Sequence, residues 1–87
     1  SGLRGVVGVS LTPETALRYA CALAAELGPG PIIVARDGRS TGRMLAAAVT
    51  SGLEAVGRKV LSADVAATPT LGVLVRTLHA AGGIQIS

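Results

Sequence analysis

The sequence predicts an α/β domain of three layers, in which helices cover both faces of a mixed, largely parallel sheet of four strands. Short apolar stretches alternate with stretches of helical periodicity in the order β-α-β-α-β-α-β, which favours strands joined by crossover helices. Two helical stretches follow a threonine-proline pair, Thr12-Pro13 and Thr68-Pro69, the usual cap and first residue of a helix. The chain has 87 residues, 49% of them hydrophobic and 15% charged, which suits one small core and excludes a disordered chain.

The first half of the chain is expected to contain two strands and two helices. An apolar stretch punctuated by glycine, residues 3–9, predicts the first strand, and the helix that begins at Thr12 is expected to stop at Gly28. Residues 32–35 form a continuous run typical of a strand buried on both faces, and helical spacing predicts a helix over 41–56 that Gly57 ends. The helix positions expected to face the core are Leu17, Ala20, Cys21, Ala24 and Leu27, then Leu45, Ala48, Val49, Gly52, Leu53 and Val56.

The second half is expected to contain two strands around a shorter helix. Residues 59–64 predict the third strand, and the helix that begins at Thr68-Pro69 is closed by Gly82-Gly83. Residues 84–87 alternate like a strand, and because a chain rarely ends on the last residue of a buried strand, we expect a longer polypeptide. The third helix is expected to turn inward Leu71, Leu74, Val75 and Leu78.

The charge pattern argues against a nucleic-acid partner. The net charge is +3, but the basic residues are dispersed, and Tyr19 is the sole aromatic residue, so no stacking platform for bases exists. A local anion site is the simpler interpretation. Two pairs at i,i+4 spacing predict ion pairs on helix surfaces, namely Glu14 with Arg18 and Glu54 with Arg58.

Other residues exclude further classes. No apolar run reaches the length of a membrane span, so no membrane partner is expected. Cys21 is the one cysteine, which excludes an internal disulfide and a cysteine-based zinc site and favours a reducing, cytoplasmic compartment. His79 lacks a second ligand at metal spacing, so we expect no metal site in this segment. From chemistry alone, Arg4 between two glycines is more simply a solvated arginine than an anion contact.

The loop from Arg36 to Gly42 is the main candidate site. It leaves a buried strand, carries two guanidinium groups and two hydroxyls, and opens a helix whose first N–H groups are unpaired, which suits a phosphate. A structural turn, in which Asp37 pairs with Arg36 or Arg39, explains the same residues equally well. Right-handed crossovers would bring this loop, Asp64 and Ser87 to one edge of the sheet, where open α/β sheets bind ligands.

Four stretches together resemble the first domain of the α-D-phosphohexomutase superfamily, which includes phosphoglucosamine, phosphomannose and phosphoglucose mutases. The stretches are SGLRGVVG with LTPE (1–8 and 11–14), ARDGRSTG (35–42), TPT (68–70) and GGIQIS (82–87). Their order and spacing agree over the whole chain, so residues 1–87 would be part of that domain, ending just before its phosphoserine loop. Ala35 departs from the glycine that the family often has there.

The resemblance implies an isomerase that moves a phosphoryl group reversibly between the 1- and 6-hydroxyls of a hexose or hexosamine phosphate. An active-site serine carries the phosphoryl group, and a bisphosphorylated sugar is the intermediate and activator. Ser87 matches the residue that opens the T/S-A-S-H-N-P loop, two positions before the phosphorylated serine, so Ser87 is not the nucleophile. Arg4 matches an arginine that approaches the phosphoserine, and is therefore expected to be catalytic. Asp37 and Arg39 look like supports of the catalytic loop, within a substrate and phosphate loop that includes Arg36 and Ser40.

The resemblance also implies Mg²⁺, held mainly by ligands in later domains, and the remaining domains of the same enzyme as partners. This segment alone is therefore expected to be inactive. The catalytic expectation depends on geometry: the chain after the fourth strand must meet Arg4 at one rim of the sheet. The alternative function is a non-catalytic α/β module that binds a phosphorylated ligand through the Arg36–Gly42 loop.

Overall fold

The structure, a computed structural model, describes residues 6–9, 12–38 and 40–86, and of these it describes the backbone alone at 6–9 and 40. The elements alternate between strand and helix, as the sequence predicts. In chain order they are β1 (Val6–Val9), α1 (Pro13–Glu26), β2 (Ile32–Arg36), α2 (Ser40–Ala55), β3 (Val60–Val65), α3 (Thr68–Thr77) and β4 (Gly82–Ile86).

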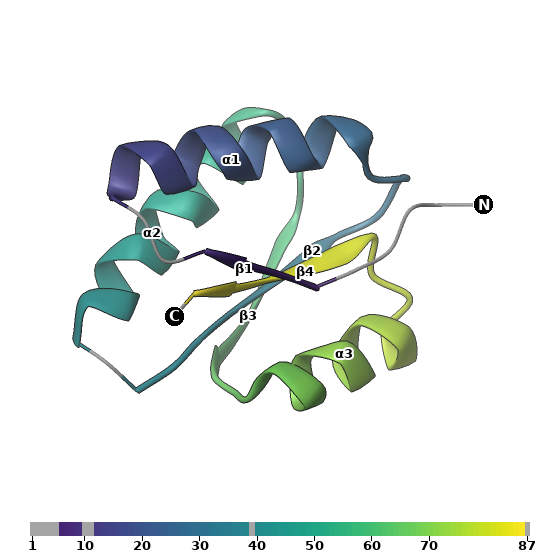
Figure 1. The fold of residues 1–87 in the computed structure, drawn as a ribbon. Helices are drawn as coiled ribbons and strands as arrows, with labels where there is room; N and C mark the ends of the chain where they lie inside the picture. Colours follow the sequence, from purple (N-terminus) through teal and green to yellow (C-terminus); the bar gives the residue numbers. More distant parts are fainter. Residues whose placement is uncertain (1–5, 10–11, 39, 87) are drawn as a thin grey trace.

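Within the described ranges, four strands form one sheet in the order β1-β4-β2-β3 (Figure 1). All three neighbouring pairs are parallel. Each connection passes through a helix, which returns the chain to the end of the sheet where the previous strand began. The predicted α/β class is confirmed, and the described sheet is parallel where a mixed, largely parallel sheet was expected.

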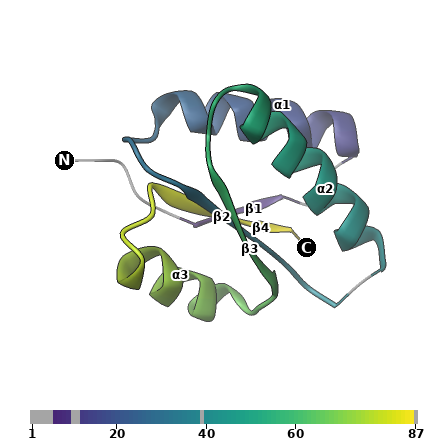
Figure 2. The ribbon, with the colours of Figure 1, turned by 180° about the vertical axis from the view of Figure 1, so that it is seen from behind.

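The sheet has α1 and α2 on one face and α3 on the other (Figures 1 and 2). Because side chains alternate along a strand, β2 sends Ile32 and Val34 into the core under α1 and α2, and Ile33 and Ala35 into the core under α3. The chain crosses the sheet in one direction from β1 to β3 and returns from β3 to β4. A single handedness of crossover therefore puts α3 on the opposite face.

Helix α1 begins as its sequence predicts. The Thr12 hydroxyl accepts a hydrogen bond from the Thr15 N–H at 3.3 Å, and Pro13 is the first helical residue. The buried face of α1 consists of alanines (Ala16, Ala20 and Ala24), which lets the helix lie close to the sheet.

The close contact between α1 and α2 depends on Gly52. A Cβ added to Gly52 would overlap the Leu17 side chain and lie 3.3 Å from the Cys21 sulfur. Leu17 and Cys21, expected in the core, are half-buried because they pack against α2 rather than against the sheet.

Two residues expected in the core, Val56 and Leu78, are exposed at 55% and 51%. The apolar periodicity of the sequence continues past the last residue of each helix. It therefore predicted buried helical positions at residues that follow the helices. Helix α2 stops at Ala55, and Gly57 then turns the chain with a left-handed φ of 86°, as expected. Leu78 likewise follows the last residue of α3.

Helix α3 differs from its prediction at both ends. It starts at Thr68, with Ala67 at the cap position and no side chain capping it, so the predicted threonine cap is wrong. His79, with φ 53°, ends the helical region, while Gly82 and Gly83 belong to β4 rather than closing α3. An arrangement of this kind leaves the first N–H groups of α3 without a side-chain acceptor.

Arg58 does not form the predicted surface pair with Glu54. Among the described residues the ion pairs are Glu14–Arg18 at 2.9 Å, which confirms that prediction, and Arg36–Asp64. Arg58 lies beyond the end of α2, so helical spacing no longer applies to it. Its guanidinium instead donates to four backbone carbonyls at the end of α1 and in the next loop, those of Ala24 (2.6 Å), Leu27 (2.8 Å), Gly28 (2.6 Å) and Gly30 (3.0 Å).

Candidate functional site

The carboxyl ends of β2, β3 and β4 form one edge of the sheet, as the sequence predicts. Backbone hydrogen bonds continue past the strand ends and fix the loops there. The Asp37 N–H donates to the Ile86 carbonyl at 3.0 Å, and the Ala66 N–H donates to the Arg36 carbonyl at 3.1 Å. The loops that leave β2 and β3 are thus held beside the last residue of β4.

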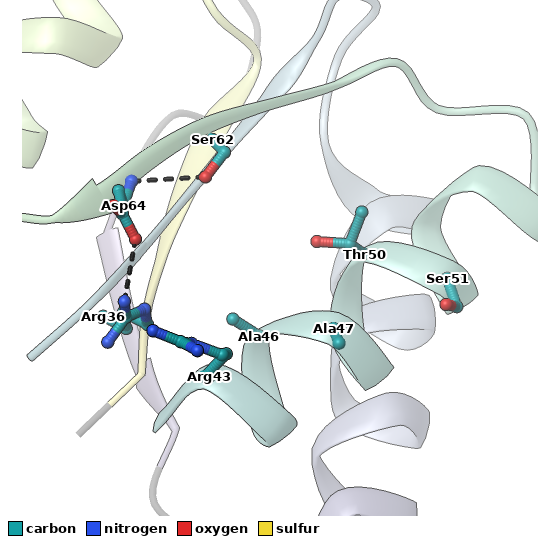
Figure 3. A pocket seen from close by; sticks show the side chains of 8 residues that line it. All are labelled: Arg36, Arg43, Ala46, Ala47, Thr50, Ser51, Ser62 and Asp64. Atoms are coloured by element: carbon teal, nitrogen blue, oxygen red, sulfur yellow. Dashed lines mark hydrogen bonds and ion pairs between the residues drawn. The ribbon is translucent and has the colours of Figure 1, made fainter. Parts of the chain in front are cut away.

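Arg36 and Asp64 meet at this edge from neighbouring strands. Arg36 Nη2 lies 2.9 Å from Asp64 Oδ1, and the side chains are 13% and 76% exposed (Figure 3). Asp64 has a left-handed φ of 56°, which aspartate tolerates better than most residues, and its N–H donates to the Ser62 hydroxyl at 3.2 Å. A nearly buried guanidinium is thereby neutralised by an exposed carboxylate.

Asp37 is held against the start of α2. Its Oδ1 lies 3.6 Å from the position that a Cβ on Gly42 would occupy, and a carboxylate is favourable beside a helix N-terminus. Arg36 Nη1 donates to the Asp37 backbone carbonyl at 3.4 Å, while its ion pair goes to Asp64. The predicted pairing of Asp37 with Arg36 is therefore wrong, because the carboxylate partner of Arg36 is Asp64, and the alternative pairing with Arg39 involves a residue outside the described ones.

Gly42 is buried in the first turn of α2 because the end of β2 lies against it. An added Cβ would be 3.4 Å from the Arg36 Cβ, which is ordinary van der Waals contact. The first turn of α2 thus packs directly against the end of β2.

A shallow groove lies between α2 and β3, next to the Arg36–Asp64 pair (Figure 3). It combines guanidinium groups, hydroxyls and small apolar side chains. Within the described residues Arg43 makes no ion pair, so it is the uncompensated cation of the groove. The groove can accept a ligand with hydroxyl groups and one negative group. Its lining residues are Arg36, Arg43, Ala46, Ala47, Thr50, Ser51, Ser62 and Asp64.

Several predicted site residues cannot be placed. Arg4, Arg39 and Ser87 lie outside the described residues, and the same holds for the Ser40 side chain. Their roles stay predictions. The described chain groups no three His, Cys, Asp or Glu side chains that could hold a metal ion. It also contains no helix that is long and apolar enough to cross a bilayer.

A family model described as phosphoglucomutase/phosphomannomutase, alpha/beta/alpha domain I, matches residues 1–87, the whole chain. The chain belongs to the phosphoglucomutase/phosphomannomutase family. The resemblance to the phosphohexomutase superfamily is therefore confirmed, at the level of its first domain.

Three curated relatives of this phosphohexomutase domain are named as phosphoglucosamine mutases, one of them as a probable one. The chain is 40% identical to the phosphoglucosamine mutase of Parasynechococcus marenigrum (strain WH8102) over 87 residues, and 46% identical to that of Nocardia farcinica (strain IFM 10152) over 90 residues, in each case covering 99% of this chain. It is 48% identical to a probable phosphoglucosamine mutase of Methanopyrus kandleri over 87 residues, 100% of this chain. The matches cover 19–20% of these relatives, so the chain spans about a fifth of their length. No solved structure matches.

The sequence analysis placed both Arg36 and Asp64 at this edge but did not predict that they pair. Both residues lie at the carboxyl ends of parallel strands, and their pairing can be inferred only once β2 and β3 are known to be neighbours.

Proposed function

We propose that the complete protein is a phosphosugar mutase that transfers a phosphoryl group between the 1- and 6-hydroxyls of a hexose or hexosamine phosphate. A phosphoserine on the loop after β4 gives its phosphoryl group to the free hydroxyl of the sugar, which forms a bisphosphorylated sugar. This intermediate reorients and returns its other phosphoryl group to the serine oxygen. The observation that carries the proposal is the match of all 87 residues to the first domain of this family.

The position of β4 supports a reactive loop after Ile86. Strand β4 lies inside the sheet, between β1 and β2, so its carboxyl end is held from both sides. The Asp37 N–H bond to the Ile86 carbonyl links this end to the candidate loop. A reactive group benefits from such a fixed base, because small misplacements of reacting atoms lower the rate steeply.

We assign Arg4 to the charge of the transferring phosphoryl group, with Asp37 and Arg39 as supports of the catalytic loop. The described register of β1 runs against the geometric condition for Arg4. Val6 pairs with Gly83 and Val9 with Ile86, so β1 starts beside the amino end of β4, at the rim opposite to the loop that follows Ile86. The role of Arg4 therefore needs a direct kinetic test.

Mg²⁺ in such an enzyme would offset negative charge on the phosphoryl group. The described carboxylates do not fit a magnesium site, because Asp37 lies against α2 and Asp64 pairs with Arg36. We assign the ligands of the ion to residues outside this chain. A cytoplasmic location stays a prediction.

The names of the relatives favour glucosamine phosphate as the substrate. The test is to incubate the purified full-length protein with glucosamine 1-phosphate and its bisphosphate, with the glucose and mannose phosphates in parallel, and to follow the 6-phosphate by phosphorus NMR. We expect interconversion, with glucosamine phosphate fastest, and a phosphoserine in the segment after Ile86 by mass spectrometry. The 87-residue chain alone should be inactive. No interconversion of any of these sugars would refute the proposal.

The alternative of a phosphate-binding module has weaker support. Its main cation in the described chain, Arg36, is already paired with Asp64. A module of this kind would require the 87-residue chain to bind a sugar phosphate by itself, which calorimetry measures directly.

A further inference from the structure

Gln85 is a polar residue inside the core of the sheet. It is 6% exposed and is the buried polar side chain of the described residues. Its neighbours across the sheet are Gly8 on β1 and Ala35 on β2, which leave room around a long side chain. Ile84 and Ile86 belong to the core under α1 and α2, so alternation turns Gln85 towards α3.

The nitrogen of the Gln85 amide forms a hydrogen bond, whereas its oxygen forms none with the described residues. Nε2 donates to the Ala66 carbonyl at 3.0 Å. Oε1 is buried and, among the described residues, has no hydrogen-bond partner. The other side chains of the core under α3 are apolar, so none of them offers a donor: Ile33, Ala35, Leu71, Val75, Ala80, Leu61, Ala63, Ala66 and Leu74.

A buried acceptor without a donor is rare in folded proteins, because it loses its bond to water and gains none in return. An apolar side chain of similar length would avoid that loss. The presence of glutamine therefore points to a donor supplied by a part of the polypeptide that the structure does not include.

The carboxyl edge is where such a donor can arrive. Gln85 is the last residue but one of β4. Its partner Ala66 lies in the β3–α3 loop, and the Ala66 N–H is bonded to the Arg36 carbonyl at that edge. The Gln85 amide is thus bonded to the β3–α3 loop at the edge of the sheet where the chain leaves β4.

We infer that Gln85 is a positioning residue for the segment that follows β4: Oε1 accepts a hydrogen bond from that segment, while Nε2 holds the β3–α3 loop through Ala66. The inference rests on the proposed function, in which this segment carries the phosphoryl group. Gln85 touches neither sugar nor phosphate. It fixes the segment to a rigid part of the sheet, so its loss should lower the rate of transfer more than the binding of substrate.

The first test compares Gln85→Met with Val75→Ala in the full-length enzyme. Methionine fills a similar volume without either hydrogen bond, and Val75→Ala loosens the same core without touching the amide. At a temperature where both are folded by circular dichroism, we expect Gln85→Met to lower kcat by about 10-fold or more with KM changed less than about threefold. Val75→Ala should keep kcat within about twofold of the wild type. A Gln85→Met kcat equal to that of Val75→Ala refutes the inference.

Gln85→Glu decides the question if Gln85→Met does not fold. A protonated carboxyl has one donor and one acceptor, like the amide, whereas a carboxylate cannot donate to Ala66. Burial among apolar side chains raises the pKa of such a carboxyl. The ratio of variant to wild-type kcat should therefore rise as the pH falls, and a ratio independent of pH refutes the inference. An inactive wild type refutes the proposed function and this inference with it, whereas an active wild type with an equally active Gln85 variant refutes the inference alone.

Discussion

Replacing Arg58 with alanine tests whether one guanidinium fixes the end of α1. Arg58 donates to the carbonyls of Ala24, Leu27, Gly28 and Gly30, and three of these four hydrogen bonds are partly buried. The last carbonyls of a helix have no partner within the helix, so the side chain supplies what the backbone cannot. Counting about 1 kcal/mol for each partly buried bond and nothing for the exposed one gives a loss of about 3 kcal/mol.

Hydrogen exchange by mass spectrometry on the full-length protein measures this loss locally. Peptides that cover residues 24–31 should exchange faster in Arg58→Ala, by about two orders of magnitude for a loss of this size. Arg58→Lys keeps the charge but has no fork that can bind several carbonyls, so it should restore less than half of the protection. Arg18→Ala is the matched control, because it removes an arginine whose ion pair is exposed and worth about 0.5 kcal/mol.

Two outcomes would contradict this account of Arg58. Unchanged exchange in Arg58→Ala would mean that water replaces the guanidinium at no cost. Full protection in Arg58→Lys would mean that the positive charge at the helix end acts alone, without directed hydrogen bonds.

Three further substitutions have outcomes that follow from single contacts. Gly52→Ala should destabilise the protein by no more than about 2 kcal/mol, because its Cβ would force the Leu17 side chain to move while the loss of a mid-helix glycine returns about 1 kcal/mol, and faster exchange in α1 peptides would report it. Asp64→Asn keeps a residue that tolerates the left-handed backbone but removes the ion pair with Arg36, and since the carboxylate is exposed the stability loss in urea unfolding should stay below about 1 kcal/mol. Arg4→Ala should lower kcat of the full-length enzyme by about 10²-fold in the phosphorus NMR assay, and an unchanged kcat would leave Arg4 without a catalytic role.

The order of the elements could be predicted because its signals are local. The Thr12-Pro13 start of α1 needs only the hydroxyl, the proline and the next turn of the chain, and it appears as expected. Helix ends were less predictable. Val56 continues the apolar periodicity of α2 but follows its last residue. The chain makes a left-handed turn at Gly57, and Val56 is exposed rather than buried.

Contacts between distant residues required the strand order, which the sequence does not state. Arg36 and Asp64 are 28 positions apart, and they meet because β2 and β3 are parallel neighbours. The alternation of residues 84–87 predicts a strand that includes Gln85. Alternation alone does not show whether such a polar side chain is buried in an interior strand or exposed on an edge strand. Its burial follows from the interior position of β4.

The interior position of β4 also constrains where the phosphate charge can be met. The end of β4 lies beside Arg36, yet that guanidinium is nearly buried and already neutralised by Asp64. A phosphoryl group near the end of β4 would have to displace the Asp64 carboxylate in order to bind Arg36. Under the proposed function, we therefore expect the main cations of the transfer to be Arg39 and residues of later domains, with Arg4 judged by its kinetic test, while the ion pair of Arg36 with Asp64 links the ends of β2 and β3.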